Sequence, residues 1–285
     1  MPDGDANELL AAWEESSQYW NKHQAKIERM FAPLTTALVD AAQIREGQSV
    51  FDIGGGSGQP SLTVAGIVGD AGSVTYTDPA MGMVKTARGE AQRRGLTNIQ
   101  FHQVSAEQLP FPDDCFDIGI GRLSVMFFPD ATAGLRQILR VVKPGGRVSF
   151  LVWSSKEANP FFQSVTDVLD RFVPPEPDDE DAPGAFRFAK PGKLAKLLSD
   201  AGAISVKEQL VPFRIEAPVS LEQFWELRSE MSDTLRQKLA TLDPAETAAV
   251  KHAVEKAVAK YFQNDEMNFP AEALIVTGKK AKKVK

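Results

Sequence analysis

The feature that most constrains the fold of this chain is an apolar strand that runs directly into a glycine-dense turn. Residues 50–60 read Val-Phe-Asp-Ile-Gly-Gly-Gly-Ser-Gly-Gln-Pro, and Pro60 is a favoured first residue of a helix. Glycine suits such a turn because the absence of a Cβ permits positive φ angles and lets a ligand approach the backbone closely. A strand, a glycine loop and a helix in this order bring backbone N–H groups up to a nucleotide-like ligand. The sequence therefore predicts a ligand-binding βα unit, although an ordinary βα turn has the same outline.

The spacing of the glycines separates two kinds of cofactor. A dinucleotide-binding loop follows the pattern G-x-G-x-x-G. Counting from Gly54, the third glycine would fall on Gln59, and counting from Gly56 it would fall on Ser61. The pattern present is D-x-G-x-G-x-G, which begins at Asp52. This spacing argues against the alternative of an oxidoreductase that uses a dinucleotide.

Strands and helices alternate after the loop, which predicts a parallel sheet with helices on both faces. A strand over 73–77 ends at Asp78. An acid at this distance from the loop, about 20 residues, is placed to accept hydrogen bonds from ribose hydroxyls. Further strands are predicted over 99–104, 115–121 and 148–153, and a helix over 131–142.

Four blocks of this region resemble the motifs of class I S-adenosylmethionine-dependent methyltransferases, above all the small-molecule enzymes of the ubiquinone/menaquinone biosynthesis type. They are the glycine loop, the strand ending at Asp78, the run Ser-Ala-Glu-Gln-Leu-Pro-Phe at 105–111 and the run Leu-Arg-Val-Val-Lys-Pro-Gly-Gly-Arg-Val at 139–148. The resemblance covers residues 47–153 well. It implies a Rossmann-like, doubly wound α/β sheet of seven strands with the last strand antiparallel. It also implies S-adenosyl-L-methionine as the cofactor and a small molecule as the methyl acceptor.

The resemblance and the strand ends together indicate which residues hold the cofactor. The expected set is Asp52, Gly54, Gly55, Gly56, Gly58, Asp78, Met83, Ser105, Ala106, Glu107, Arg122 and Leu123. Met83 would pack on the adenine, or it would fill the core as Met residues often do. Ser105 departs from the family pattern, which has an Asp there for the adenine amino group. A hydroxyl can still accept a hydrogen bond, but adenine would then be held mainly by the backbone near Ala106 and by packing.

Catalysis leaves a weaker trace, because methyl transfer depends on positioning and a general base is optional. His23 is the first candidate for a base, and Tyr19 lies beside it at i, i+4 spacing on a predicted helix. The alternative for His23 is a surface histidine bonded to solvent or backbone.

Arg122 is a third catalytic candidate, because it directly follows the fourth predicted strand. Its guanidinium could clamp the cofactor carboxylate or an acidic substrate in a bidentate manner. The alternative is an ion pair with Asp117 or Asp130.

The rest of the chain divides into a cap, a core and an insertion. We predict a helical N-terminal cap over 1–46, built from an amphipathic helix over 6–31 and a shorter one over 33–42. The cofactor-binding core is predicted over 47–218 and 269–280, with late strands over 204–215 and 273–278. Residues 219–268 are predicted as an all-helical insertion or lid, and 174–181 as an acidic, proline-rich loop.

Cap and insertion could roof the carboxyl ends of the strands, where ligands of open α/β sheets bind. A roofed pocket suits a small acceptor, because methyl transfer benefits from alignment and exclusion of water. Aromatic residues near the expected pocket are predicted to form an apolar or aromatic wall for the acceptor, with only two or three of them in contact with it. They are Phe127, Phe128, Trp153, Phe161, Phe162, Phe186 and Phe188. Together with the resemblance, this implies an aromatic or quinone-like acceptor.

Composition excludes several other functions. No apolar run approaches the ~20 residues that span a bilayer, and the first residues lack the features of a signal peptide. The single cysteine, Cys115, fits a reducing cytoplasm, and with only three histidines a zinc site is not expected. The net charge is −6, and we interpret the basic tail over 279–285 as a solvated terminus and not as a nucleic-acid arm. A cofactor-binding regulator without catalysis stays open as an alternative, as does the oligomeric state.

Overall fold

The computed structural model describes residues 3–175 and 179–282 of the chain. Part of the acidic loop expected over 174–181 and the last residues of the basic tail lie outside the described residues. A single sheet with the order β3-β2-β1-β4-β5-β8-β6 forms the centre of the molecule, with β7 paired to β8 at its side. The strands are β1 Ser49–Ile53, β2 Ser73–Asp78, β3 Ile99–Gln103, β4 Phe116–Arg122, β5 Val142–Trp153, β6 Ala203–Ala217, β7 Phe262–Gln263 and β8 Glu266–Lys280.

The pairing of the strands confirms the predicted fold class. Strands β1 to β5 pair in parallel, and β8 runs antiparallel between β5 and β6. The strand order runs outward from β1 to β3 on one side and from β4 to β5 on the other, so the two halves of the sheet meet between β1 and β4. In sheets of this kind the crevice at that point, beyond the carboxyl ends of the strands, binds ligands.

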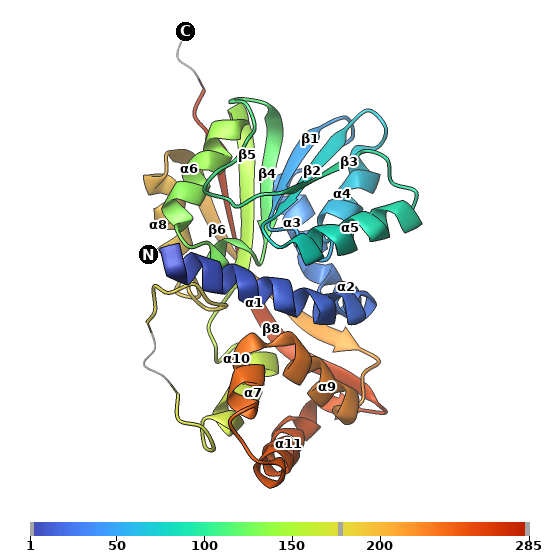
Figure 1. Ribbon diagram of the computed structural model, residues 1–285. Helices are drawn as coiled ribbons and strands as arrows, with labels where there is room; N and C mark the ends of the chain where they lie inside the picture. The colour runs from blue at the N-terminus through green and yellow to red at the C-terminus, as the bar shows by residue number, and fades with distance from the viewer. Residues whose placement is uncertain (1–2, 176–178, 283–285) are drawn as a thin grey trace.

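Helices surround this sheet and also form a separate group at its lower end (Figure 1). The α-helices are α1 Asp3–Lys22, α2 Gln24–Met30, α3 Ala32–Ala42, α4 Ser61–Val68, α5 Met81–Arg93, α6 Ala131–Val141, α7 Pro160–Leu169, α8 Lys193–Asp200, α9 Leu221–Met231, α10 Asp233–Leu239 and α11 Pro244–Val258. Helix α1 crosses between the sheet above and the group of α7, α9, α10 and α11 below (Figure 1). The middle of the molecule is therefore covered by the first helix of the chain.

The single helix predicted over 6–31 is wrong in one respect, because the chain breaks at His23. This residue has φ −101° and ψ 9°, outside helical geometry, and it separates α1 from α2. The break lets α1 pack on α5 and α9 while α2 packs on β6 and α3. An apolar periodicity that continues through the break cannot reveal it.

The late strands are longer than predicted, and the segment before β8 is not wholly helical. Strands β6 and β8 pair along nearly their whole length, from Ala203 opposite Lys280 to Ala217 opposite Met267. A two-residue strand, β7, folds back on β8 through Asn264 and Asp265, which have φ angles of 53° and 58°. Two consecutive residues with positive φ, of the types that tolerate it, are typical of a tight hairpin turn. That pair was the sequence signal for the hairpin.

Within residues 3–175 and 179–282, none of the helices combines the length and the apolar composition that a membrane-spanning segment requires. In the same part of the chain, no group of three or more His, Cys, Asp or Glu side chains is arranged to hold a metal ion.

Candidate cofactor and acceptor site

A cavity of about 560 Å³ lies at the carboxyl ends of β1, β2 and β4. Its floor is the glycine loop, and its roof comes from α1. The lining residues are Ala6, Asn7, Leu9, Leu10, Trp13, Trp20, Phe31, Ile53, Gly54, Gly55, Gly56, Ser57, Gln59, Asp78, Pro79, Met83, Ser105, Ala106, Glu107, Gln108, Arg122, Leu123, Ser124, Phe127, Phe128, Pro129 and Asp130. Within the described chain, the predicted insertion over 219–268 contributes no lining residue, so the roof of the cavity is the N-terminal helix.

The glycine loop is shaped from beneath by a buried tyrosine. Gly54 and Gly56 have φ angles of 65° and 54°, which side chains rarely adopt. The Tyr76 ring is fully buried under Gly55, and its hydroxyl donates a hydrogen bond of 2.6 Å to the Gly56 carbonyl. The backbone of the loop is thereby presented to the cavity in one fixed conformation.

Asp78, at the end of β2, anchors the loop and faces the cavity. Its Oδ2 accepts a hydrogen bond of 3.0 Å from the Gly56 N–H, and its Oδ1 accepts one of 2.9 Å from the Ala80 N–H. Burial raises the pKa of Asp78 to about 7, against the lowering effect of these two backbone bonds. A carboxylate held this way still has lone pairs free for hydroxyl donors of a ligand.

Two residues of the predicted cofactor set lie behind the cavity and are not part of its lining. The fully buried Asp52 accepts a hydrogen bond of 2.7 Å from Ser61 Oγ at the start of α4, and burial raises its pKa to about 6. Gly58 has φ 119°, and a Cβ there would lie 2.7 Å from Leu62 Cδ1. Both residues shape the loop and the start of α4, so their effect on a ligand would be indirect.

Arg122 lies at the end of β4 and points beneath the N-terminal helices. Its Nη1 donates to Thr35 Oγ1 at 2.7 Å and to the Phe31 carbonyl at 3.3 Å, while its Nε is buried without a partner. Burial lowers its pKa to about 10, and the negative charges of Asp52 and Glu28 counteract this. The guanidinium therefore stays charged at neutral pH beside the cavity.

The alternative partners considered for Arg122 are engaged elsewhere. Asp117 forms an ion pair of 2.6 Å with Lys143, and Asp130 caps α6 by accepting from the Ala133 N–H at 2.9 Å. Next to Arg122, Leu123 adopts φ 57°, and its N–H donates to the Leu151 carbonyl at 2.8 Å. This turn ends β4 and directs the following segment over the cavity.

The opposite wall contains the remaining residues of the predicted set, namely Met83, Ser105, Ala106 and Glu107. Met83 and Ala106 are buried, and Glu107 Oε1 accepts a hydrogen bond of 3.3 Å from the Asp130 N–H. Ten of the twelve residues expected to hold the cofactor thus meet in one cavity.

His23 and Tyr19 are placed outside this cavity. The His23 ring is buried and lies 2.6 Å from Glu230 Oε2 of α9, and the Tyr19 ring packs beneath the Arg236 guanidinium at 4.9 Å. In the described part of the chain neither residue lines the cavity, since His23 contacts α9 and Tyr19 contacts α10. The predicted role of His23 as a base, with Tyr19 beside it, therefore gains no support from their placement.

The aromatic residues also divide in two. Phe127 and Phe128 line the cavity together with Trp13, Trp20 and Phe31 from the N-terminal helices. Trp13 packs edge-on against Phe127 with ring centroids 5.0 Å apart. Trp153, Phe161, Phe162, Phe186 and Phe188 lie outside the lining, in the neighbouring core. No motif in the sequence marks Leu9, Leu10, Trp13 and Trp20 as site residues, since only the path of α1 brings them over the loop.

Known proteins are similar to this chain in sequence and in fold. A sequence model of the ubiE/COQ5 methyltransferase family matches residues 26–175. Aklanonic acid methyltransferase DauC of Streptomyces sp. (strain C5) is 34% identical over 169 residues, which are 59% of this chain and 71% of that protein. The ubiquinone/menaquinone biosynthesis C-methyltransferase UbiE of Ectopseudomonas mendocina is 41% identical over 141 residues. That match takes up 48% of this chain and 54% of UbiE, so the chain spans about half the length of this relative.

Two solved structures illustrate the shared fold. The YcgJ protein from Bacillus subtilis superposes with a TM-score of 0.57 at 20% identity, over 87% of this chain and 98% of that one. Phosphoethanolamine N-methyltransferase 2 of Haemonchus contortus, in complex with S-adenosyl-L-methionine, gives 0.56 at 15% identity, over 93% of this chain and 58% of that one. At these identities the likeness shows the fold alone.

Proposed function

Because the chain belongs to the ubiE/COQ5 methyltransferase family and is an S-adenosylmethionine-dependent methyltransferase, we propose that its acceptor is a small aromatic or quinone-like molecule. The observation that carries this proposal is that one cavity is lined both by the glycine loop with Asp78 and Met83 and by a cluster of aromatic rings. We assign the cofactor to the loop residues, as the first end of the cavity, and the acceptor to the aromatic rings, as the second end. The volume of about 560 Å³ is within the roughly 300–1,000 Å³ of small-molecule pockets.

The first end fits the cofactor. Gly56 leaves open space where its Cβ would stand, so a ligand can approach the loop backbone there, and the buried Asp78 carboxylate is available for ribose hydroxyls. Met83 and Ala106 offer apolar surface for the adenine, and Ser105 and Glu107 offer acceptors at its rim. Arg122 supplies a positive charge for the carboxylate of the methionine part.

The second end fits a flat, apolar acceptor. Trp13 and Phe127 pack edge-on, and Trp20, Phe31 and Leu10 extend the wall. S-adenosylmethionine supplies an electrophilic methyl group when it is bound. The aromatic wall would hold the acceptor atom in line behind that methyl group, and α1 would exclude water from the contact.

Affinity for S-adenosylhomocysteine should depend on pH through Asp78. Its pKa in the folded protein is about 7 against an ordinary value of 3.8, so the folded state keeps a proton between these values that the unfolded chain has lost. Ionising Asp78 therefore reduces folding stability as the pH rises toward 7. Ribose hydroxyls prefer the ionised form, so affinity should rise with pH and level off above 7, by up to about tenfold per pH unit below it.

Calorimetric titrations from pH 5.5 to 8.5 would measure this dependence. Asp52 also titrates within this range, with a pKa of about 6, although it lies behind the loop and bonds to Ser61. The matched control that isolates the contribution of Asp78 is therefore Asp78→Asn. In that variant the dependence on pH should disappear. A wild-type affinity that is flat across this range would contradict the role of Asp78.

The acceptor proposal is tested by methyl transfer to a panel of hydroquinones, phenols and aromatic acids, with phosphoethanolamine as a non-aromatic comparison. We expect saturable formation of S-adenosylhomocysteine with an aromatic member. Trp13→Ala should raise the KM for that acceptor by about tenfold, as the loss of a buried aromatic contact implies. It should leave the KM for S-adenosylmethionine nearly unchanged. Turnover with non-aromatic acceptors only would refute the proposal.

A further inference from the structure

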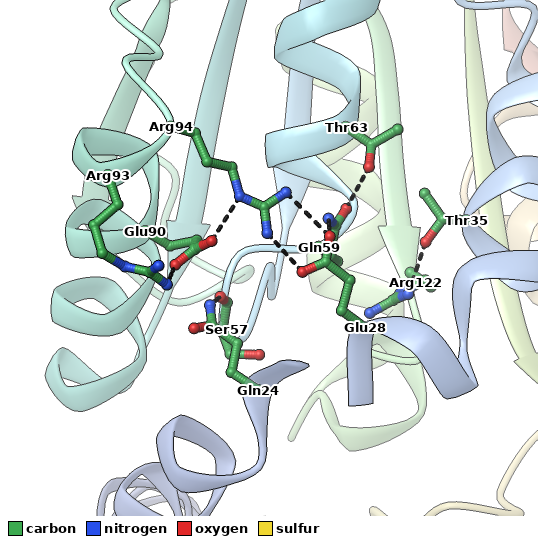
Figure 2. Close-up of polar contacts among 10 residues, drawn as sticks. All are labelled: Gln24, Glu28, Thr35, Ser57, Gln59, Thr63, Glu90, Arg93, Arg94 and Arg122. Carbon is green, nitrogen blue, oxygen red and sulfur yellow. Dashed lines mark hydrogen bonds and ion pairs between the residues drawn. The ribbon is translucent and has the colours of Figure 1, made fainter. Parts of the chain in front are cut away.

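A charged network connects the N-terminal helices to the glycine loop beside the cavity (Figure 2). At its centre is Glu28 of α2. Arg94 donates to Glu28 through both terminal nitrogens, at 3.0 Å to Oε1 and 2.6 Å to Oε2. Arg94 also donates through Nε to the buried Glu90 of α5 at 2.6 Å. Such a two-pronged contact between guanidinium and carboxylate fixes direction as well as distance.

Glu28 reaches the glycine loop through Gln59. The Gln59 Nε2 donates to Glu28 Oε1 at 2.8 Å, and the Gln59 Oε1 accepts from Thr63 Oγ1 at 2.8 Å. Both ends of this amide are therefore committed, which fixes its orientation. Gln59 stands where a dinucleotide-binding loop would carry its third glycine, and it lines the cavity. Gln59, the residue by which this loop departs from the dinucleotide-binding pattern, is thus held by Glu28 of α2.

A second contact from the same helix holds the other side of the loop. Gln24 Nε2 donates to the Ser57 carbonyl at 2.6 Å (Figure 2). The loop is consequently fastened to α2 at two points, the backbone carbonyl of Ser57 and the side chain of Gln59. The hydrogen bonds from Arg94 keep the pKa of Glu28 below its ordinary value, so the carboxylate is charged at neutral pH.

We propose that Glu28 is a positioning residue for cofactor binding, which acts through Gln59 and Arg94 to hold the glycine loop in its binding conformation. This inference rests on the proposed cofactor site. A loop already fixed in the bound form loses less conformational entropy when the ligand arrives. Without the Glu28 charge, the loop would sample other conformations, and the bound form would have to be selected from them.

Calorimetric titration of the full chain with S-adenosylhomocysteine tests this inference. Glu28→Gln keeps the shape of the side chain and removes its charge, and we expect the Kd to rise by about tenfold, as for loss of a charge-assisted contact. The matched control is Glu226→Gln, which breaks the exposed ion pair of 2.6 Å between Lys22 and Glu226, away from the loop. That variant should bind like the wild type.

A comparison of the Glu28 substitution in a second variant, Gln59→Leu, distinguishes the positioning role of Glu28 from a merely structural role. If Glu28 acts through Gln59, the effect of Glu28→Gln should vanish in a Gln59→Leu protein, because the link is already broken. Independent roles would instead multiply the two losses and would overturn the proposed route. Arg94→Met provides the same comparison from the other side of Glu28 should Glu28→Gln fail to fold.

The remaining outcomes separate the two proposals. If the wild type does not bind S-adenosylhomocysteine, the proposed cofactor site itself fails. If the wild type binds and Glu28→Gln binds equally well, only the positioning role of Glu28 is overturned.

Discussion

Replacing Gly55 with alanine should strongly weaken cofactor binding, with the Kd for S-adenosylhomocysteine rising at least about 100-fold. The new Cβ would lie 2.4 Å and 2.5 Å from Cε2 and Cδ2 of Tyr76 and 3.1 Å from Oδ2 of Asp52. The Tyr76 ring is fully buried, and its hydroxyl bonds to the Gly56 carbonyl, so it has no room to step aside. The loop must move instead, and overpacking of this kind also costs about 1–3 kcal/mol of stability.

Gly66→Ala is the matched control for this substitution. Gly66 lies within α4, and apart from its chain neighbours and the backbone of its own helix no described atom lies within 4 Å of the position of its Cβ. Alanine in a helix should stabilise the protein by about 0.5–1 kcal/mol and leave binding unchanged. Titration of both variants with S-adenosylhomocysteine would compare their affinities, and thermal unfolding would compare their stabilities. If Gly55→Ala bound the ligand like the wild type, the loop would not be held rigidly by Tyr76.

Asp78→Ala should also have a large effect on cofactor binding. It removes the acceptor for the N–H groups of Gly56 and Ala80 as well as the acceptor proposed for ribose hydroxyls. Losing bonds to a charged acceptor costs about 1.5–3 kcal/mol, and loosening of the loop adds to this. We therefore expect the Kd for S-adenosylhomocysteine to rise by about 100-fold or more, since each 1.4 kcal/mol is tenfold.

Asp70→Ala is the control, because it removes the same charge from an exposed site before β2. Titration at pH 8, where Asp78 is mostly ionised, gives the clearest comparison. Equal affinities for the two variants would show that the Asp78 carboxylate does not contact the ligand.

The core of the fold could be predicted because its signals are local. Glycine spacing, an acid at a strand end and the Lys-Pro-Gly-Gly turn all lie within short stretches of sequence. Because parallel strands bring their carboxyl ends to one edge of the sheet, Gly54, Asp78 and Arg122 line the same cavity. The prediction of the cofactor-binding residues depended on this geometry together with the family resemblance.

The remaining features depend on contacts between distant segments. The break at His23 and the path of α1 are set by packing on α5 and α9, which helical periodicity does not encode. For the same reason the sequence does not indicate that His23, the candidate base, lies against Glu230 of α9. The link from Glu28 to Gln59 and Arg94 joins residues 31 and 66 positions apart, and no motif marks it.

Calorimetric titration of the purified protein with S-adenosylhomocysteine at pH 8 would show whether the cavity between the glycine loop and α1 binds the cofactor. We predict binding of one ligand per chain with a Kd in the micromolar range, and a loss of that binding in Asp78→Ala. Absence of binding at millimolar ligand, or equal binding to Asp78→Ala, would contradict this prediction.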